Sequence, residues 1–127
     1  MPKEHWVLVV EDDEGLRYAF SRAFENAGLK VDSVSSGRDA VEILNLNSSK
    51  YCVVTLDMLL PSVHGSSVIA HVARTSPRLA IVVITGYPDR VLFTDQGDRH
   101  VVKAIFVKPV EMADVVAYVA SRCAREE

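Results

Sequence analysis

Charged and hydroxyl-bearing side chains follow four short apolar runs of this sequence. They are Glu11, Asp12 and Asp13 after the first of these runs, Asp57 after the second, Thr85 after the third and Lys108 after the fourth. Carboxylate oxygens are hard ligands, and a group of them without neighbouring His or Cys suits Mg²⁺, which also accepts phosphate oxygens. If the fold brings these residues together, they predict a site for metal-assisted phosphoryl chemistry.

The acidic residues of this set repel one another unless a cation neutralises them. Two unit charges ~4 Å apart repel by about 4 kcal/mol at an effective dielectric constant of about 20, so Glu11, Asp12 and Asp57 would raise one another's pKa values. With the charge neutralised, one carboxylate can attack an electrophilic phosphorus and form an aspartyl phosphate. Lys108 would then stabilise charge on the transferring group, and the Thr85 hydroxyl would hydrogen-bond to a phosphoryl oxygen.

Five short runs, apolar and rich in β-branched residues, are the elements that would position these side chains. The runs are Trp6–Val10, Val31–Val34, Cys52–Leu56, Ala80–Ile84 and Ala104–Val107. Their continuous apolar character is typical of strands covered on both faces of a parallel sheet. Because the carboxyl ends of parallel strands meet at one edge, the polar residues that follow them are expected to meet there as well. An ordinary structural role explains each of these residues singly but not four matching strand ends.

Apolar residues at helical spacing occupy most of the segments between the runs. Predicted helices cover Leu16 to Ala27 with Gly28 as the stop, a segment opened by Ser36 and Asp39 as a capping box, Ser66 to about Arg74, and a last segment with Met112, Val115, Val116, Val119 and Cys123 on one face. Strands and helices that alternate five times indicate an open α/β sandwich with right-handed crossovers.

The fourth connection has the least regular pattern. Pro88 is predicted to open a short helix that holds Val91 and Leu92, and Gly97 is predicted to end it. The segment from residue 98 to 100 shows no apolar periodicity.

The composition is that of one globular domain. The chain has 127 residues, 49% apolar and 24% charged, which predicts a single domain over residues 1–127 with no output domain in this chain. No apolar run approaches the ~20 residues that span a bilayer, so no membrane partner is expected. The net charge is −3 without a basic cluster, which argues against direct nucleic-acid binding.

The two cysteines, Cys52 and Cys123, form neither a CxxC pair nor a metal-ligand spacing. Each falls on an apolar stripe, so we interpret them as small core hydrophobes in a reducing cytoplasm rather than as a redox pair. The amino terminus does not lead into a secretory signal, which also favours a cytoplasmic location.

Four sequence blocks resemble, in the same order, the signature blocks of response-regulator receiver domains of two-component signalling. The blocks are VLVVEDDEGLR, VVTLDMLLPSVHG, IVVITGY and FVKP. The resemblance covers a core of about residues 5–123, and the spacing of Asp57, Pro61 and Gly65 is its most specific part. It implies an α/β, flavodoxin-like (βα)5 fold with a doubly wound, five-stranded parallel sheet in the order 2-1-3-4-5. It also implies a signalling switch and not a metabolic enzyme.

The resemblance assigns roles to the acidic residues. Asp57 would be the phosphoacceptor, and it would take the phosphoryl group from a sensor histidine kinase or a phosphotransfer protein of a phosphorelay. Asp12 would be a direct ligand of Mg²⁺ (or Mn²⁺), and Glu11 would act through water. Asp57 itself and the backbone carbonyl of Leu59 would complete the metal site, with Asp13 as a variable neighbour.

The resemblance also assigns the switching residues. Thr85 would be the hydroxyl that moves to the phosphoryl group, Lys108 would be its cationic partner, and the Lys108–Pro109 peptide is expected to be cis. Ile105 stands where the family usually has an aromatic switch residue. Phe106 is adjacent, but its side chain is expected on the opposite face of the strand. The coupling of phosphorylation to output therefore departs from the family pattern.

Leu59 and Tyr87 are expected to set the lifetime of the phosphorylated form. They lie two residues beyond Asp57 and Thr85, where polar groups in similar proteins help to position the hydrolytic water. An apolar Leu59 and a bulky Tyr87 would exclude that water, which predicts a long-lived phosphorylated protein.

Three other functions are weighed against this one. A receiver-like interaction module that works without phosphorylation is favoured by Ile105 but not by the acidic residues. A phosphatase of the haloacid-dehalogenase type needs a second Asp where this chain has Leu59, and a flavin binder would meet repulsion of its phosphate by Glu11 and Asp12. The kinase, the stimulus, the output partner or domain, and the oligomeric state, a homodimer included, are left open by the sequence.

Overall fold

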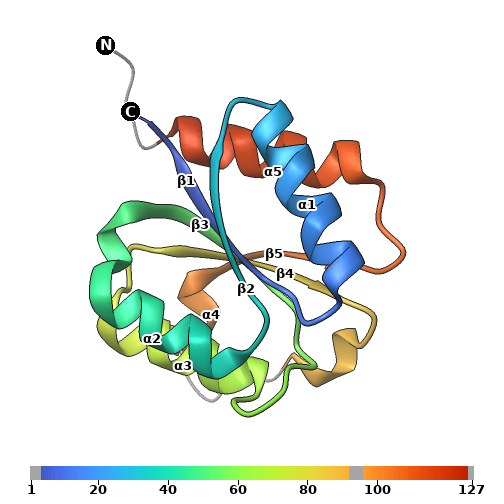
Figure 1. Ribbon diagram of the computed structural model, residues 1–127. Coiled ribbons are helices and arrows are strands. Elements are labelled where there is room, and N and C mark those ends of the chain that lie inside the picture. Colours follow the sequence, from blue (N-terminus) through green and yellow to red (C-terminus); the bar gives the residue numbers. More distant parts are fainter. Residues whose placement is uncertain (1–3, 92–95, 126–127) are drawn as a thin grey trace.

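Strands and helices alternate along the whole described chain (Figure 1). The computed structural model describes residues 4–91 and 96–125. The strands are β1 (Trp6–Val10), β2 (Lys30–Val34), β3 (Tyr51–Leu56), β4 (Ala80–Thr85) and β5 (Val102–Val107). The helices are α1 (Glu14–Asn26), α2 (Gly37–Asn47), α3 (Gly65–Thr75), α4 (Gln96–Val101) and α5 (Met112–Ala124), with 3₁₀ turns at Ser48–Lys50 and Pro88–Arg90.

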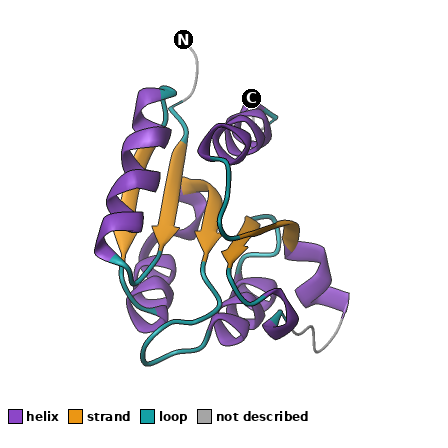
Figure 2. Cartoon of the chain, turned by 90° about the vertical axis from the view of Figure 1, so that its right-hand side faces the viewer, coloured by secondary structure: helices purple, strands orange, loops and turns teal. Residues whose placement is uncertain are grey.

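The five strands form one parallel sheet in the order β2-β1-β3-β4-β5. Helices α1 and α5 cover one face, and α2 and α3 cover the other (Figure 1). The strand arrows of Figure 2 point toward the same edge of the sheet, where the loops that follow them gather. This architecture confirms the predicted flavodoxin-like fold and the predicted strand order.

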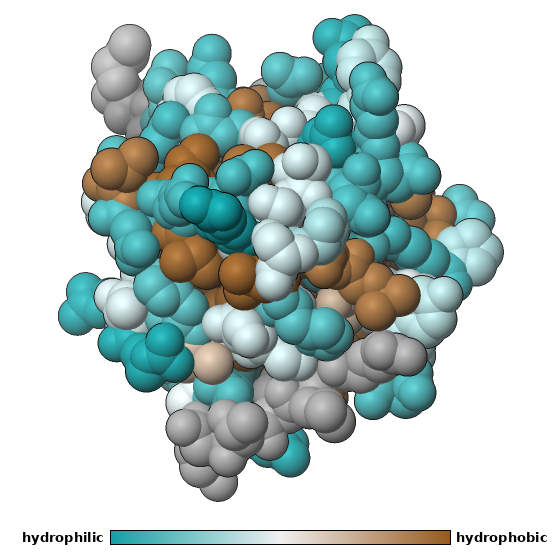
Figure 3. Space-filling model, turned by 60° about the horizontal axis from the view of Figure 1, so that its bottom comes forward, coloured by the Kyte–Doolittle hydropathy of each residue, from teal (hydrophilic) through white to brown (hydrophobic). Residues whose placement is uncertain are grey.

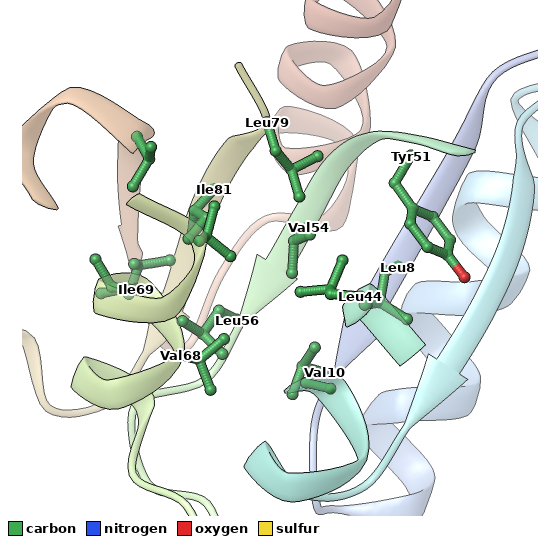
Figure 4. Packing of buried hydrophobic residues seen from close by; sticks show 14 of the residues in the cluster. Leu8, Val10, Leu44, Tyr51, Val54, Leu56, Val68, Ile69, Leu79 and Ile81 are labelled. Atoms are coloured by element: carbon green, nitrogen blue, oxygen red, sulfur yellow. The ribbon is translucent and has the colours of Figure 1, made fainter. Parts of the chain in front are cut away.

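Two apolar clusters pack against the two faces of the sheet. Leu8 and Val10 of β1 point toward α2 and α3, whereas Val7 and Val9 of the same strand point toward α1 and α5. Figure 4 shows the first cluster, in which side chains of the strands meet those of the helices. Every residue of β3 and β4 is buried, which explains why these strands have no polar alternation.

Local signals in the sequence mark the start of α2 and the end of α1. The Ser36 hydroxyl accepts a hydrogen bond from the backbone N–H of Asp39 (3.1 Å), as the predicted capping box requires. Gly28, which follows α1, has φ of 90°, a conformation that favours glycine over other residues. Among the described helices, none is both long and apolar enough to cross a bilayer.

The prediction for the fourth connection is wrong. Pro88 opens only a 3₁₀ turn, and Gly97 lies inside α4 instead of ending a helix; the predicted helical residue Leu92 is outside the described residues. The sequence gives no helical signal for α4, because the face of this helix that packs inward carries a charged residue. Within residues 97–101 of α4, Asp98 and Val101 are the buried residues, so no apolar periodicity marks this segment.

The interpretation of Cys52 and Cys123 as unbonded core residues is also wrong. Both sulfurs lie in the apolar cluster beneath α1 and α5, as predicted, but they form a disulfide between β3 and α5. Apolar periodicity places each cysteine on a buried face, but it does not specify that two residues 71 positions apart meet there.

Gly37 gives a first testable prediction about the fold. A Cβ atom at Gly37 would lie 1.9 Å from the backbone oxygen of Val63, in the loop after Asp57. Gly37→Ala should therefore displace that loop and lower the free energy of unfolding by about 1–3 kcal/mol, as overpacking does. Urea unfolding followed by circular dichroism measures the change.

Gly15→Ala is the matched control for Gly37→Ala. Gly15 also lies near the start of a helix, but its added Cβ would meet only the Asp13 side chain, at 3.4 Å. Alanine there should raise stability, by up to about 1 kcal/mol, through helix propensity. Equal effects of the two substitutions would contradict the close approach of Gly37 to the loop.

Candidate functional site

The predicted acidic residues meet at the carboxyl edge of the sheet. Glu11 follows β1 and Asp57 follows β3, and the two strands are paired so that the Asp57 N–H donates to the Val10 carbonyl (3.1 Å). Glu11, Asp12 and Asp57 each place a carboxylate oxygen within 4.8 Å of the others. Glu11 and Asp57 are buried, with 3% and 7% of their surface exposed, whereas Asp12 is exposed to solvent.

Lys108 reaches this acidic cluster from the end of β5. Its Nζ lies 2.7 Å from Glu11 Oε1 and 3.0 Å from Asp57 Oδ2, so one ammonium group bridges two buried carboxylates. The Lys108 backbone N–H donates to the Thr85 carbonyl (2.9 Å), which fixes the start of the side chain beside β4. The next peptide, Lys108–Pro109, is cis as expected.

Burial and pairing shift the pKa values of this site in a consistent way. Burial raises the pKa of Glu11, although its hydrogen bond with Lys108 acts against the increase. For Lys108, burial alone would lower the pKa, but the hydrogen bonds and charges of Glu11 and Asp57 outweigh burial and raise it. Lys108 is therefore held in its charged form.

The donor set fits a hard divalent cation. Lys108 pairs with two of the three carboxylates, Glu11 and Asp57, so the cluster retains an excess of negative charge. The ligands are all oxygens, and Asp12 opens the cluster to solvent, so a bound ion can keep waters. These are the features that Mg²⁺ prefers.

Thr85 is the last residue of β4, the strand beside β3, and Leu59 lies two residues beyond Asp57. Thr85 is completely buried, and its hydroxyl accepts a hydrogen bond from the Tyr87 N–H (3.0 Å). The Leu59 N–H donates to Asp57 Oδ1 (3.2 Å), which fixes the orientation of the Asp57 carboxylate. Tyr87 is 49% exposed.

Ile105 and Val107 leave an exposed apolar strip on β5. They are 44% and 51% exposed, whereas Val101, the α4 residue directly before β5, is buried in the cluster on the side of α2 and α3. Phe106 points to the other face, where its ring packs edge-on against Tyr118 at 6.0 Å. Figure 3, which brings the carboxyl edge forward, shows hydrophobic patches separated by hydrophilic side chains.

Comparison with known families agrees with this arrangement. The model of the response regulator receiver domain matches residues 7–120, which is most of the chain. The chain belongs to this family. Asp57, the residue for which the resemblance predicted the role of phosphoacceptor, directly follows β3 and lies within the acidic cluster.

Other receiver proteins resemble this receiver domain over most of its length. The response regulator receiver protein CpdR of Brucella abortus is 27% identical over 110 residues, 87% of this chain and 89% of that protein. The transcriptional regulatory protein TcrA of Mycobacterium tuberculosis is 33% identical over 94 residues, 72% of this chain but 36% of that protein. The chain spans half or less of the length of several other curated relatives.

Solved structures support the fold of this receiver domain. The response regulator receiver domain protein from Clostridium thermocellum superposes with a TM-score of 0.83 at 21% identity, and the match covers 96% of each chain. At this identity the likeness establishes the fold alone.

Two residues that support the acidic loop of the receiver domain were not predicted from the sequence. Asp13 caps α1, because its carboxylate accepts a hydrogen bond from the Leu16 N–H (2.8 Å). Arg17, the fourth residue of α1, donates to the carbonyls of Glu11 (3.0 Å) and Asp12 (3.4 Å). An Arg one or two helical turns after an acidic strand end is the signal that could have indicated this contact.

Proposed function

We propose that this receiver domain is a phosphorylation switch whose phosphoacceptor is Asp57. The observation that carries the proposal is the bridge formed by Lys108 Nζ between Glu11 and Asp57, inside a cluster of three carboxylates. Such a bridge holds a nucleophile and a cation at the place where a phosphoryl group would arrive. The phosphoryl donor would be the phosphohistidine of a sensor histidine kinase or of a phosphotransfer protein.

Each residue of the site would have a separate role in the transfer of the phosphoryl group. An Asp57 oxygen attacks the phosphorus, the phosphorus–nitrogen bond of the phosphohistidine breaks, and its electron pair goes to the imidazole. The Leu59 N–H orients the Asp57 carboxylate. The Lys108 ammonium group, which contacts Asp57 Oδ2, stabilises the negative charge that develops on the phosphoryl oxygens. Thr85 would exchange its hydrogen bond from Tyr87 for one that it donates to a phosphoryl oxygen.

The carboxylates would hold the metal that assists this transfer. Asp12 and Asp57 would bind it directly, Glu11 would bind through water, and the Leu59 carbonyl would be a further ligand. Mg²⁺ or Mn²⁺ would supply neutralisation of charge on the carboxylates and the phosphoryl group.

The output would follow from a change in the population of two conformations. The exposed strip of Ile105 and Val107 lies on the edge strand β5, which Lys108 directly follows, so it is the surface that we expect to change. We propose that residues 1–127 form one receiver domain that acts in the cytoplasm. The partner that reads the changed surface is a protein and not nucleic acid.

Phosphorylation of Asp57 can be tested directly. The protein should gain one phosphoryl group after incubation with Mg²⁺ and a small acyl phosphate, as measured by intact mass. Asp57→Asn or chelation of the metal should abolish the gain, because the first removes the nucleophile and the second restores the repulsion among the carboxylates. Asp39→Asn, an exposed Asp at the start of α2, is the matched control and should be phosphorylated normally.

The absence of any mass gain would contradict the switch and favour a phosphorylation-independent interaction module. In that case partner affinity should be equal for the native protein and for Asp57→Ala in the presence of the phosphodonor. A lower partner affinity of Asp57→Ala in the presence of the donor would instead support the switch.

The lifetime of the phosphorylated form gives a second prediction. Leu59 is two residues beyond Asp57 and offers no side-chain hydrogen bond, so Leu59→Asn should let water approach the aspartyl phosphate and shorten its half-life severalfold. Loss of the phosphorylated mass after donor removal measures the half-life. Leu46→Asn makes the same chemical change at an 85% exposed position of α2, away from the acidic cluster, and should leave the half-life unchanged. Slower decay in Leu59→Asn than in the native protein would contradict the role of Leu59.

A further inference from the structure

We propose that the Cys52–Cys123 disulfide is a reversible redox tether that fixes the last turn of α5 to β3. Cys52 is the second residue of β3, and Asp57 follows the last residue of the same strand. The tether therefore lies at the end of the sheet opposite the acidic cluster. It would give the domain a second chemical input, separate from phosphorylation.

A β-bulge directs Cys52 toward α5. Trp6 of β1 pairs with Tyr51, but the next residue, Val7, pairs with Val53, so Cys52 is the extra residue of β3. Tyr51 packs on the side of α2 and α3, whereas Cys52 and Val53 both pack on the side of α1 and α5. A bulge redirects a side chain in this way. The Cα atoms of Cys52 and Cys123 are 5.3 Å apart, within the range that a disulfide spans.

Cys123 holds the last turn of α5 against the sheet. The buried residues of this helix are Val115, Val119 and Cys123, one in each successive turn. Cys123 is thus the buried residue of the last turn, and its bond to Cys52 ties that turn to the sheet. When the bond is broken, one small side chain remains to hold this turn in place, so local opening should become easier.

The surroundings of the two sulfurs are suited to the reduced state as well. Both belong to a closed apolar cluster, where a thiol packs as a small hydrophobe. Cys52 Sγ lies 3.3 Å from the Trp6 carbonyl, which can accept a hydrogen bond from the thiol after reduction. The chain has no third cysteine with which the pair could exchange. These features favour a pair that cycles while the fold persists.

The proposed location indicates a transient bond. In reducing cytoplasm, disulfides are rare, and those that form are usually catalytic or redox-sensing. This step rests on the proposed cytoplasmic location, but it does not depend on phosphorylation of Asp57. The two proposals can fail separately, because a phosphoryl mass gain and thiol alkylation are independent readouts on the same sample.

The reducing partner would be a dithiol. Both cysteines are buried in the structure, so a thiolate of the partner attacks Cys52 Sγ when local opening of the last turn of α5 uncovers the bond, and the Cys123 thiolate leaves and takes a proton. The second thiol of the partner then attacks the mixed disulfide and releases the Cys52 thiol. Two electrons pass from the dithiol, which becomes a cyclic disulfide, to the cystine. The reverse exchange with an oxidised dithiol restores the tether.

Hydrogen exchange followed by mass spectrometry tests the tether on the whole chain. Protein purified in air should resist alkylation until dithiothreitol is added, and then two thiols should be alkylated. In the reduced protein, local opening should lower amide protection in the last turn of α5 by at least about tenfold, whereas α3 should lose protection only at amides that exchange through global unfolding. Oxidised dithiothreitol should restore the original pattern.

The variant Cys52→Ala/Cys123→Ala provides the matched control. It should show the low α5 protection of the reduced protein and should not respond to reductant. Free thiols in the air-purified protein would overturn the proposal, as would unchanged α5 protection after reduction. Global unfolding on reduction would also overturn it, since the bond would then be a structural requirement and not a switch.

Discussion

Replacement of Lys108 by alanine is expected to slow phosphorylation of Asp57 by about 10²–10³-fold, the loss that follows removal of one preorganised donor at a site of developing charge. Lys108 Nζ lies 3.0 Å from Asp57 Oδ2 and 2.7 Å from Glu11 Oε1. As the phosphoryl group transfers, negative charge develops on its oxygens, beside this ammonium group. The interaction is therefore stronger in the transition state than before the reaction, which is the condition for an effect on rate.

The same substitution should strengthen metal binding. Without Lys108, Glu11 and Asp57 lose their cationic partner, so a divalent cation would meet a more negative site. The pKa of Glu11, already raised by burial, should rise further because the hydrogen bond and charge that lower it are gone. Slower phosphorylation together with a lower Kd for Mg²⁺ separates loss of catalysis from loss of the metal site.

Lys103→Ala is the control for Lys108→Ala. Lys103 is on the same strand but near its beginning, whereas the acidic cluster lies beyond the carboxyl ends of the strands. Its phosphorylation rate should match that of the native protein, as measured by intact mass at saturating phosphodonor and Mg²⁺. A Lys108→Ala rate within about tenfold of the native rate would contradict the charge-stabilising role.

The sequence predicts the elements of this receiver domain that have regular physical signatures. The strands are continuous apolar runs because the parallel sheet is covered on both faces, and β1 has the predicted bounds, Trp6–Val10. The acidic cluster was predictable because the carboxyl ends of parallel strands share an edge. The contacts within it, such as the bridge by Lys108, require the side-chain geometry as well.

Two features could not be predicted, because in each a single residue departs from the apolar periodicity of its element. Asp98 is buried on α4, so the helix has no apolar stripe. Cys52 is the extra residue of a β-bulge, and the bulge breaks the alternation from which side-chain direction is read in a strand. Both errors arise where tertiary contacts override a local periodicity.

Loss of the disulfide is expected to lower the free energy of unfolding by about 4 kcal/mol in the loop-entropy model. Cys52 and Cys123 are 71 residues apart, so the bond restricts more than half of the unfolded chain. The native state retains its apolar cluster around both sulfurs, so the effect falls mainly on the unfolded state. Since small domains have about 5–15 kcal/mol of stability, the reduced domain should remain folded at room temperature.

Urea unfolding in the presence and absence of dithiothreitol measures this contribution. The midpoint of the native protein should fall by about 1–4 M on reduction, given the usual dependence of stability on urea for domains of this size. The double variant Cys52→Ala/Cys123→Ala should unfold near the reduced midpoint in both conditions, displaced only by the small cavities that the missing sulfurs leave. An unchanged midpoint in a sample whose thiols are fully alkylated would show that the bond does not constrain the unfolded chain. A large loss of global stability with little change in the amide protection of α5 would assign the disulfide a purely structural role. Urea unfolding and hydrogen exchange together therefore distinguish a structural bond from a redox switch.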